Sequence, residues 1–448
     1  MNRVKLVSLL LLGIISAGCS SSYRFESEQP NKTPLIKKYS SELKSFNTDI
    51  VDKDTIDVLT LKKAVVIALQ NNPRLIAYNL EIKALEKNAL QQGLSPNPML
   101  ALNTENIFGS GIYSGFSASA ITLLLSQDIM LAGKLDKRRK VAALQSDLAA
   151  WDYEKKRLDL ITEVRVSFIG ALTLQKNIVQ LKELLKISNE FLSNVEKRIK
   201  VGKVSPAESS RAKVIVSALE IKLNNSEYAY KSVIQQLVKQ LGSDKITFKK
   251  LDGKLIILDQ LPKFGLLKSK LLQSPEIAIY KKVFEKQKAV IDLENAKAIP
   301  DLTISAGLRW LNQTSNNSFI IGTAIPLPIF NRNQGARQEA VIRLSQKKSE
   351  FKADKNKFVA ELTTTYNTLL SLSVSLKKLN KESIPNAQNA FEIIRAGNLL
   401  GRFTILDVLD SQRTLFELQS EYLKTLGGYN VQLARLERLI GQNLETIN

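Results

Sequence analysis

Side chains that could carry out catalysis or hold a metal are scarce in this 448-residue chain. It contains no histidine and a single cysteine, which excludes histidine-based triads, histidine metal sites and thiolate clusters. The sequence also contains no phosphate-binding loop and no catalytic pair of carboxylates. We therefore expect no catalytic residue, no metal site and no cofactor, and we expect that the protein is not an enzyme.

Two carboxylates are nevertheless placed where they could act together. Asp407 and Asp410 are three residues apart, so they share one face of a helix. Carboxylates in this arrangement attract cations. The alternative is ordinary surface pairing with Arg402, Arg413 or Lys203.

The lone cysteine, Cys19, directly follows the small residues Ser16, Ala17 and Gly18. Residues 1–18 have a basic start and an apolar run too short to cross a bilayer, which is typical of a secretory signal peptide. The residues before Cys19 resemble a bacterial lipobox, although Ser16 stands where leucine is usual. We expect cleavage before Cys19 and lipidation of that residue. The alternative is a plain signal peptide followed by an incidental cysteine.

The chain is strongly basic. Its formal net charge is +21, and removing Arg3 and Lys5 with the signal peptide leaves +19. Such a balance suggests anionic partners. The export signal argues against a nucleic-acid partner, and the lysines are spread along helices, so we interpret the charge as a solvated helical surface.

One exceptionally long helix is expected over residues 134–200. This stretch lies between Gly133 and Gly202, lacks proline and contains only Gly170. At about 1.5 Å per residue, the helix would be roughly 100 Å long. Apolar residues recur along it at coiled-coil spacing, at Leu144, Trp151 and Leu158 and, after a slip of one residue, at Ala171, Ile178, Leu185, Leu192 and Ile199.

The chain is a duplication. Landmarks recur at an offset of 202 residues and later of 199, which is a strong sign of an internal repeat. The matched landmarks are Pro73 and Pro275, Pro98 and Pro300, Gly133 and Gly335, Gly202 and Gly401, and Gly242 and Gly441.

Each half is expected to contain a helix, two strands, a long helix and a return helix. In order, the expected segments are a signal peptide (1–18), a lipidated tether (19–54), a first repeat (55–242), a linker (243–270), a second repeat (271–441) and a tail (442–448). The first repeat has strands at 99–108 and 116–127 and the long helix 134–200; the second has strands at 301–311 and 319–327 and a long helix at 336–395, in which Pro385 should bend or break the helix.

The strands have the length of tilted transmembrane β-strands, about 9 to 11 residues. Four such strands cannot close a barrel, and open edges are not tolerated in lipid because each unpaired backbone group costs several kcal/mol. Three chains would supply twelve strands. The alternative is a small soluble sheet that caps a helical bundle.

The duplicated order of elements resembles the TolC-type outer-membrane efflux proteins from about Thr60 to Gly441. Within them, local motifs resemble the heavy-metal, CzcC-like branch. The most specific is Pro-Leu-Pro-Ile-Phe-Asn-Arg-Asn-Gln-Gly at 326–335, and weaker ones lie at 60–64, 72–73, 94–98 and 407–413. The resemblance implies a mainly α protomer of duplicated α-hairpins and β-hairpins. It also implies a homotrimer with a 12-stranded outer-membrane β-barrel continued by a 12-helix periplasmic α-barrel.

The same resemblance implies a passive conduit of a tripartite efflux system, lipid-anchored in the outer membrane and extending through the periplasm. Its partners would be a periplasmic adaptor protein, an inner-membrane pump of the RND type and outer-membrane lipid, and its cargo metal cations or drugs. One alternative is the outer-membrane component of a type I protein secretion system, which neighbouring genes would distinguish. A periplasmic coiled-coil scaffold lipoprotein without a pore is another.

In this family the turns between the long and return helices lie at the periplasmic tip and contact the adaptor. Helix stops at glycine and capping boxes (Ser205 with Glu208, Thr404 with Asp407) account for much of both turns. The apolar side chains of Val201, Val204, Phe403 and Ile405, which are expected to be exposed, favour contact. The resemblance also places Asp407 and Asp410 just inside the second tip, where three copies would form a charged periplasmic gate. The implied adaptor-contacting residues are Val201, Gly202, Val204, Ser205, Gly401, Phe403, Thr404 and Ile405.

Overall fold

The protein is described from a computed structural model that covers residues 55–202, 204–243 and 246–444. The expected signal peptide, the lipidated Cys19, the tether and residues 445–448 of the tail lie outside the described residues, and these assignments stay predictions. The described chain forms two compact units. The first, here called the strand unit, comprises residues 81–150 and 284–345; the second, the hairpin unit, comprises residues 55–80, 151–283 and 346–444.

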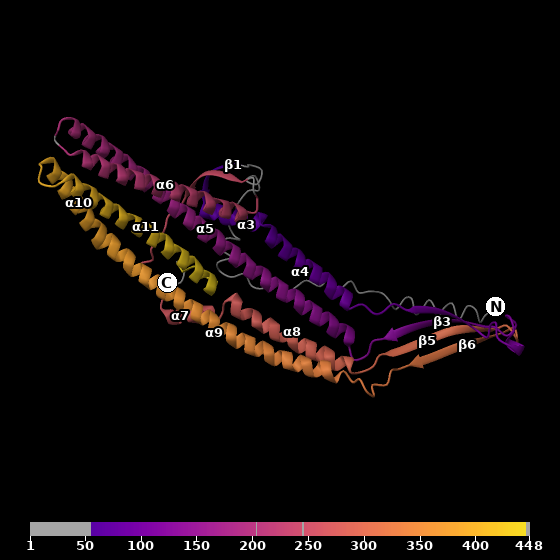
Figure 1. Cartoon of the computed structure of the whole chain (residues 1–448). Helices are drawn as coiled ribbons and strands as arrows, with labels where there is room; N and C mark the ends of the chain where they lie inside the picture. The colour runs from indigo at the N-terminus through magenta and orange to yellow at the C-terminus, as the bar shows by residue number, and fades with distance from the viewer. Residues whose placement is uncertain (1–54, 203, 244–245, 445–448) are drawn as a thin grey trace. The chain divides into compact units, whose positions relative to one another are not determined.

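The strand unit contains one antiparallel sheet with the order β2-β3-β5-β6 (Figure 1). Its strands are β2 (Met99–Glu105), β3 (Ala120–Ile129), β5 (Leu302–Leu311) and β6 (Asn316–Ala324). The central pair, β3 and β5, joins the two sequence repeats. The edge strands β2 and β6 are each paired on one side only within the described chain.

The strand limits agree with those expected at Met99 and Leu311 and differ at the other six ends. The loop between β2 and β3 is longer than expected because Asn106 and Phe108 adopt positive φ and a short 3₁₀ turn, η2, follows at Gly111–Tyr113. β6 ends at Ala324, before Pro326 and Pro328, since proline has no N–H to donate to the ladder.

The two faces of this sheet differ in chemistry. Cross-strand neighbours share a face, and alternate rows point to opposite sides. One face carries the rows Leu100, Leu125, Ala306, Ile321 and Leu102, Leu123, Leu308, Phe319. The opposite face is mixed. It carries the rows Met99, Ser126, Ser305, Gly322 and Asn103, Thr122, Arg309, Ser318, with an ion pair of 2.7 Å between Arg309 and Glu105, and between these rows lies the apolar row Ala101, Leu124, Gly307, Ile320.

Each repeat contributes one helical hairpin. The first consists of α5 (Lys134–Lys200) and α6 (Pro206–Leu241), and the second of α9 (Gln334–Lys378), α10 (Ile384–Leu399) and α11 (Ile405–Ile440). Among the described residues, none of the helices is both long enough and apolar enough to pass through a membrane.

The second long helix does not run as one α-helix over 336–395. It starts earlier, at Gln334, and a π-helical turn, η3 (Leu379–Ser383), interrupts it before Pro385. Pro385 occupies the first turn of α10, where its missing N–H costs little, and the wider turn accommodates its ring. The chain therefore remains helical to Leu399 instead of breaking at the proline.

The first helix of the first repeat is divided as well. A single helix was expected from Thr60 to Gln92, but α3 (Leu61–Asn71) and α4 (Pro73–Gln92) are separated at Asn72. The Asn72 side chain accepts from the Arg74 amide at 3.0 Å and donates to the Gln240 carbonyl at 3.1 Å. Asn72 thus starts α4 and attaches it to the end of α6.

A small parallel sheet was not anticipated. β1 (Thr55–Thr60) pairs with β4 (Thr247–Asp252), and β4 lies in the segment expected to be a linker. The same segment continues into α7 (Phe264–Leu271), which precedes α8 (Pro275–Lys297).

The hairpin unit has two main apolar cores. One joins α3, α5 and α6 around Phe168, and the other joins α7, α9 and α11 around Tyr429. Near the end of α11, Arg438 binds Asp159 of α5 at 2.6 Å and Glu276 of α8 at 2.9 Å. The ion pairs of Arg438, which is partly buried, therefore join helices of both repeats.

Candidate functional site

The turn between α5 and α6 is closed by Gly202. Its φ of 73° lies in the left-handed region that glycine tolerates, and its amide donates to the Ile199 carbonyl at 2.9 Å. Ser205 caps α6, because its hydroxyl accepts from the Ala207 amide at 3.3 Å. Both glycine and serine therefore have structural tasks here.

Of the capping box expected between Ser205 and Glu208, the cap by the Ser205 side chain is present, but the reciprocal hydrogen bond to the Glu208 side chain is not. The Glu208 carboxylate accepts from Arg211, three residues further along α6, at 3.1 Å. Arginine at this spacing competes for the carboxylate, so Ser205 caps the helix without a reciprocal bond from Glu208.

The turn between α10 and α11 holds Phe403 in place. Gly401 has a φ of 74°, and Arg402 donates its amide to the Gly397 carbonyl at 2.9 Å. A Cβ at Gly397 would lie 2.5 Å from Cδ2 of Phe403, so glycine is required for the ring to rest on α10. The Asn398 side chain also donates to the Phe403 carbonyl at 2.8 Å. Phe403 is thus a positioned side chain, although it stays 38% exposed.

The capping box expected between Thr404 and Asp407 is present. The Asp407 amide donates to the Thr404 hydroxyl at 3.2 Å, and the Thr404 amide and hydroxyl donate to Oδ2 of Asp407 at 2.8 and 2.7 Å. These hydrogen bonds lower the pKa of Asp407 below its ordinary value of 3.8. Because the folded-state pKa is depressed, the stabilisation by this cap is present above about pH 4 and is lost as the pH falls through the lowered pKa.

Two of the side chains expected to be exposed at the tips are instead part of the core. Ile405 is buried with Val195 and Leu409, and Val204 packs against this cluster. The cluster joins α5 with α11, so the two turns lie side by side (Figure 1). Val201, by contrast, is 66% exposed. The apolar surface of the tips is therefore formed by Val201 and Phe403, with Leu400 and Leu406 beside Phe403 in the chain.

Leu400 and Leu406 were missed by sequence reasoning. Both are exposed, at 71% and 48%. The signal was an apolar run on both sides of Gly401, but the sequence does not say which members of such a run face solvent.

Asp407 and Asp410 lie on the exposed side of the first turns of α11. Asp410 accepts from Arg413 at 2.7 Å, and both side chains of this pair are largely exposed. The expected surface pairing with Arg413 is therefore present, whereas Asp407 is occupied by its cap. Among the residues that the structure covers, no group of three acidic or cysteine side chains could hold a metal ion.

Comparison with known proteins identifies the fold and the family. The chain matches the family model described as outer membrane efflux protein over residues 64–243 and 266–442. It is similar to the cobalt-zinc-cadmium resistance protein CzcC of Cupriavidus metallidurans, with 28% identity over 393 residues that cover 88% of this chain and 92% of CzcC. No enzymatic activity is named for this relative.

Two solved structures share the fold. A membrane protein from Pseudomonas aeruginosa has a TM-score of 0.74 at 18% identity, covering 95% of this chain and 98% of that chain. CusC has a TM-score of 0.71 at 19% identity, covering 95% and 100%. The expected mainly α protomer with duplicated hairpins is confirmed. The chain belongs to the outer membrane efflux protein family.

Proposed function

We propose that this protein is the outer-membrane channel of a tripartite efflux system. An inner-membrane pump would deliver substrates through a periplasmic adaptor, and the substrates would pass along the channel to the exterior. The channel itself would be passive, with no energy source of its own. Membership of the outer membrane efflux protein family supports this proposal. The observation that carries it is the chemistry of the four-stranded sheet.

One face of that sheet suits lipid, and the other is the more polar of the two, with polar rows on both sides of the row Ala101, Leu124, Gly307, Ile320. Leu102, Leu308, Phe319 and Ile321 belong to the apolar face, and Phe319 and Ile321 are 68% and 83% exposed in the single chain. Exposed apolar side chains in such regular rows need an apolar environment. Alternation of an apolar and a polar face is the pattern of transmembrane β-barrels, in which the polar face lines the lumen.

The free edges of the sheet support a closed barrel of several copies. β2 and β6 run antiparallel to each other, since each neighbouring pair in β2-β3-β5-β6 is antiparallel. The β6 edge of one copy can therefore pair with the β2 edge of the next in the same antiparallel pattern. Three copies closed in this way give a barrel of about twelve strands without an edge in lipid.

The helices offer matching surfaces for the same ring. Exposed apolar residues on α6 recur at intervals of seven at Val214, Ile221 and Tyr228, and α9 exposes Leu370 and Val374. A seam of this period packs against another helix. Two different seams on one chain allow head-to-tail contacts that close into a ring of identical copies.

Cation selectivity of the reconstituted protein tests the channel and the proposed gate together. The purified chain should give conducting steps in a planar bilayer, with preference for K⁺ over Cl⁻. Changing Asp407→Asn and Asp410→Asn together removes the negative charges but keeps an amide oxygen at the cap of α11. We expect the cation preference of this double variant to fall several-fold.

Glu417→Gln is the matched control, because Glu417 is an exposed carboxylate seven residues beyond Asp410 on the same helix. It should leave selectivity unchanged. Wild-type protein without conducting steps would contradict the channel itself, whereas a conducting double variant with unchanged selectivity would contradict only the gate.

Apolar contact at the tips predicts a separate effect on efflux. Val201→Asp and Phe403→Asp place charge on the two exposed apolar side chains of the turns, and we expect loss of the adaptor contact. A deletion strain complemented with either variant should become sensitive to the metals, dyes, detergents or antibiotics that the wild-type gene protects against. Outer-membrane levels of the protein should not change.

Ser210→Asp is the control for this experiment, since Ser210 is an exposed polar residue of α6 close to the first turn. It should preserve tolerance. Full tolerance in both tip variants would exclude these side chains from an essential contact. The same sensitivity scan defines the cargo, for which CzcC, named for resistance to cobalt, zinc and cadmium, makes divalent metals the first choice.

A further inference from the structure

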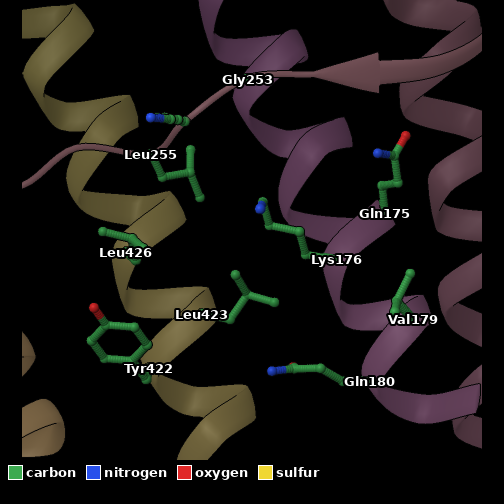
Figure 2. A pocket seen from close by; sticks show the side chains of 10 residues that line it. Gln175, Lys176, Val179, Gln180, Gly253, Leu255, Tyr422, Leu423 and Leu426 are labelled. Carbon is green, nitrogen blue, oxygen red and sulfur yellow. The ribbon is translucent and has the colours of Figure 1, made fainter. Parts of the chain in front are cut away.

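A cavity of about 570 Å³ lies within the hairpin unit between α5 and α11, beneath the chain segment that contains Gly253. Figure 2 shows Lys176 and Gln180 projecting from α5 toward α11, and Leu423 projecting back toward α5. Neither the proposed conduit nor the tips assign a task to this cavity. Its volume is within the range of small-molecule sites, about 300 to 1,000 Å³.

The cavity lies between two points at which α5 and α11 are in contact, one before and one after the lining residues along the helices. On one side the helices are in close contact, since a Cβ at Gly427 would lie 2.5 Å from Oγ1 of Thr173. On the other side Leu181 of α5 packs with Phe416 of α11. The space between these contacts is therefore bounded along the helices by packed side chains.

One wall of the cavity is held firmly. Gln175 donates to the Leu251 carbonyl at 2.9 Å and accepts from the Leu251 amide at 3.0 Å. This pair of hydrogen bonds attaches α5 to β4, just before the segment that covers the cavity. The start of the covering segment is therefore held in place relative to α5.

The lining is amphipathic. Val179, Leu255, Leu423, Leu426 and the Tyr422 ring supply apolar surface. Lys176 and Lys254 also line the cavity, and both are exposed. Neither lysine forms an ion pair with a carboxylate of residues 55–202, 204–243 or 246–444. An apolar cleft with two unpaired ammonium groups matches an anion that carries an apolar tail.

Gln180 adds a specific requirement. Its Oε1 is buried, and within the described part of the chain it has no hydrogen-bond donor. Burial of such an oxygen without a partner is unfavourable, so an occupant that donates a hydrogen bond is favoured.

We propose that this cavity binds a single-chain anionic amphiphile that carries a hydroxyl group next to its acidic head. The aliphatic chain would lie against Leu423 and Leu426, the carboxylate or phosphate would face Lys176 and Lys254, and the hydroxyl would donate to Oε1 of Gln180. A 3-hydroxy fatty acid and a lysophospholipid both have this chemistry. The site is independent of the channel proposal, because it is built within one chain.

Displacement of a fluorescent fatty acid from the full-length protein in amphipol tests the site. The probes are 3-hydroxytetradecanoate, lysophosphatidylglycerol with the same chain length, and the neutral tetradecanol. We expect saturable displacement by at least one of the two anions, with affinity at least ten-fold above that of tetradecanol. The anion that binds more tightly identifies the source of the ligand.

Two variants locate the binding. Lys176→Gln together with Lys254→Gln removes both ammonium groups and should weaken the anion at least ten-fold. Lys182→Gln is the matched control, since Lys182 is an exposed lysine of α5 that pairs with Glu227 and does not line the cavity. Thermal unfolding of the ligand-free variants checks that they fold.

Three results would overturn the proposal: no saturable displacement by either anion, tetradecanol binding as tightly as the anions, or unchanged affinity in the double lysine variant. Tetradecanoate, which lacks the hydroxyl, should bind several-fold more weakly than its 3-hydroxy form. Equal affinity of these two acids would exclude the role given to Gln180.

Discussion

Replacing Ile321 by lysine is expected to prevent assembly of the protein in the outer membrane, whereas the same substitution at Ile320 is expected to be tolerated. Ile321 lies on the apolar face, in the row with Leu100, Leu125 and Ala306. A lysine facing lipid near the middle of the bilayer costs about 2 to 4 kcal/mol in each copy. Ile320 faces the other side, in the row with Ala101, Leu124 and Gly307, and its cross-strand neighbour Gly307 has no side chain. In the proposed barrel that side faces the lumen, where a lysine can be hydrated.

This pair of variants separates the barrel from a soluble sheet. In the single chain Ile321 is 83% exposed and Ile320 is half-buried, so burial alone predicts the larger damage at Ile320. The barrel predicts the opposite order. The amounts of folded oligomer in purified outer membranes, measured by heat-modifiable migration in gels, decide between them. Equal amounts for both variants, or more of the Ile321→Lys protein, would reject the lipid-facing assignment.

Replacing Arg438 by leucine is expected to lower the free energy of unfolding by about 2 to 4 kcal/mol, because two acidic groups would lose their shared partner. The Arg438 guanidinium binds Asp159 and Glu276, and its side chain is only 24% exposed. Burial acts to lower the pKa of Arg438, but the adjacent carboxylates outweigh it and raise that pKa. Lys155 and Lys156 lie 3.3 Å from Glu276 and Asp159, respectively, so each carboxylate keeps one exposed or partly exposed lysine but loses the guanidinium that the two carboxylates share.

Denaturant unfolding of the detergent-solubilised protein measures this loss. The combined change of Arg438→Leu, Asp159→Asn and Glu276→Gln should recover part of it, since the less exposed acidic groups are then neutral and only the more exposed Lys155 and Lys156 lose their carboxylate partners. Arg343→Leu, which removes a largely exposed ion pair with Glu339, should change the unfolding free energy by less than about 0.5 kcal/mol. A loss no larger for Arg438→Leu than for this control would show that the network does not stabilise the fold.

The overall fold was predictable because its periodic patterns are long. Gly133 and Gly202, both with positive φ, delimit a helix with an apolar seam, and the alternation along β5 identified the apolar and polar faces of a strand. Such patterns depend on neighbours in the chain. The register that joins the two strand pairs, and hence the rows on each face, depends on β3–β5 partners that are 173 (Ile129 and Leu302) to 191 (Ala120 and Leu311) positions apart, and it required the structure.

The details of the tips were less predictable for the same reason. Ile405 follows a capped turn and had the pattern of an exposed apolar residue, but it is covered by Val195 from the other repeat. The Glu208 carboxylate could accept a hydrogen bond from the Ser205 amide or from Arg211, and the sequence permits both. In the structure it accepts from Arg211. The parallel pairing of β1 with β4 joins segments almost 190 residues apart, with no turn signal between them.

The π-helical turn at Leu379–Ser383 has a consequence for the phase of the second hairpin. A regular α-helix returns to the same azimuth after about 18 residues, which is five turns. Val374 and Ile393 are 19 residues apart, and both are exposed, at 66% and 55%. The residue that the π turn adds compensates this difference, so both side chains keep a common azimuth. The π turn therefore accommodates Pro385 and also keeps the exposed apolar residues before and after it on the same side of the helix.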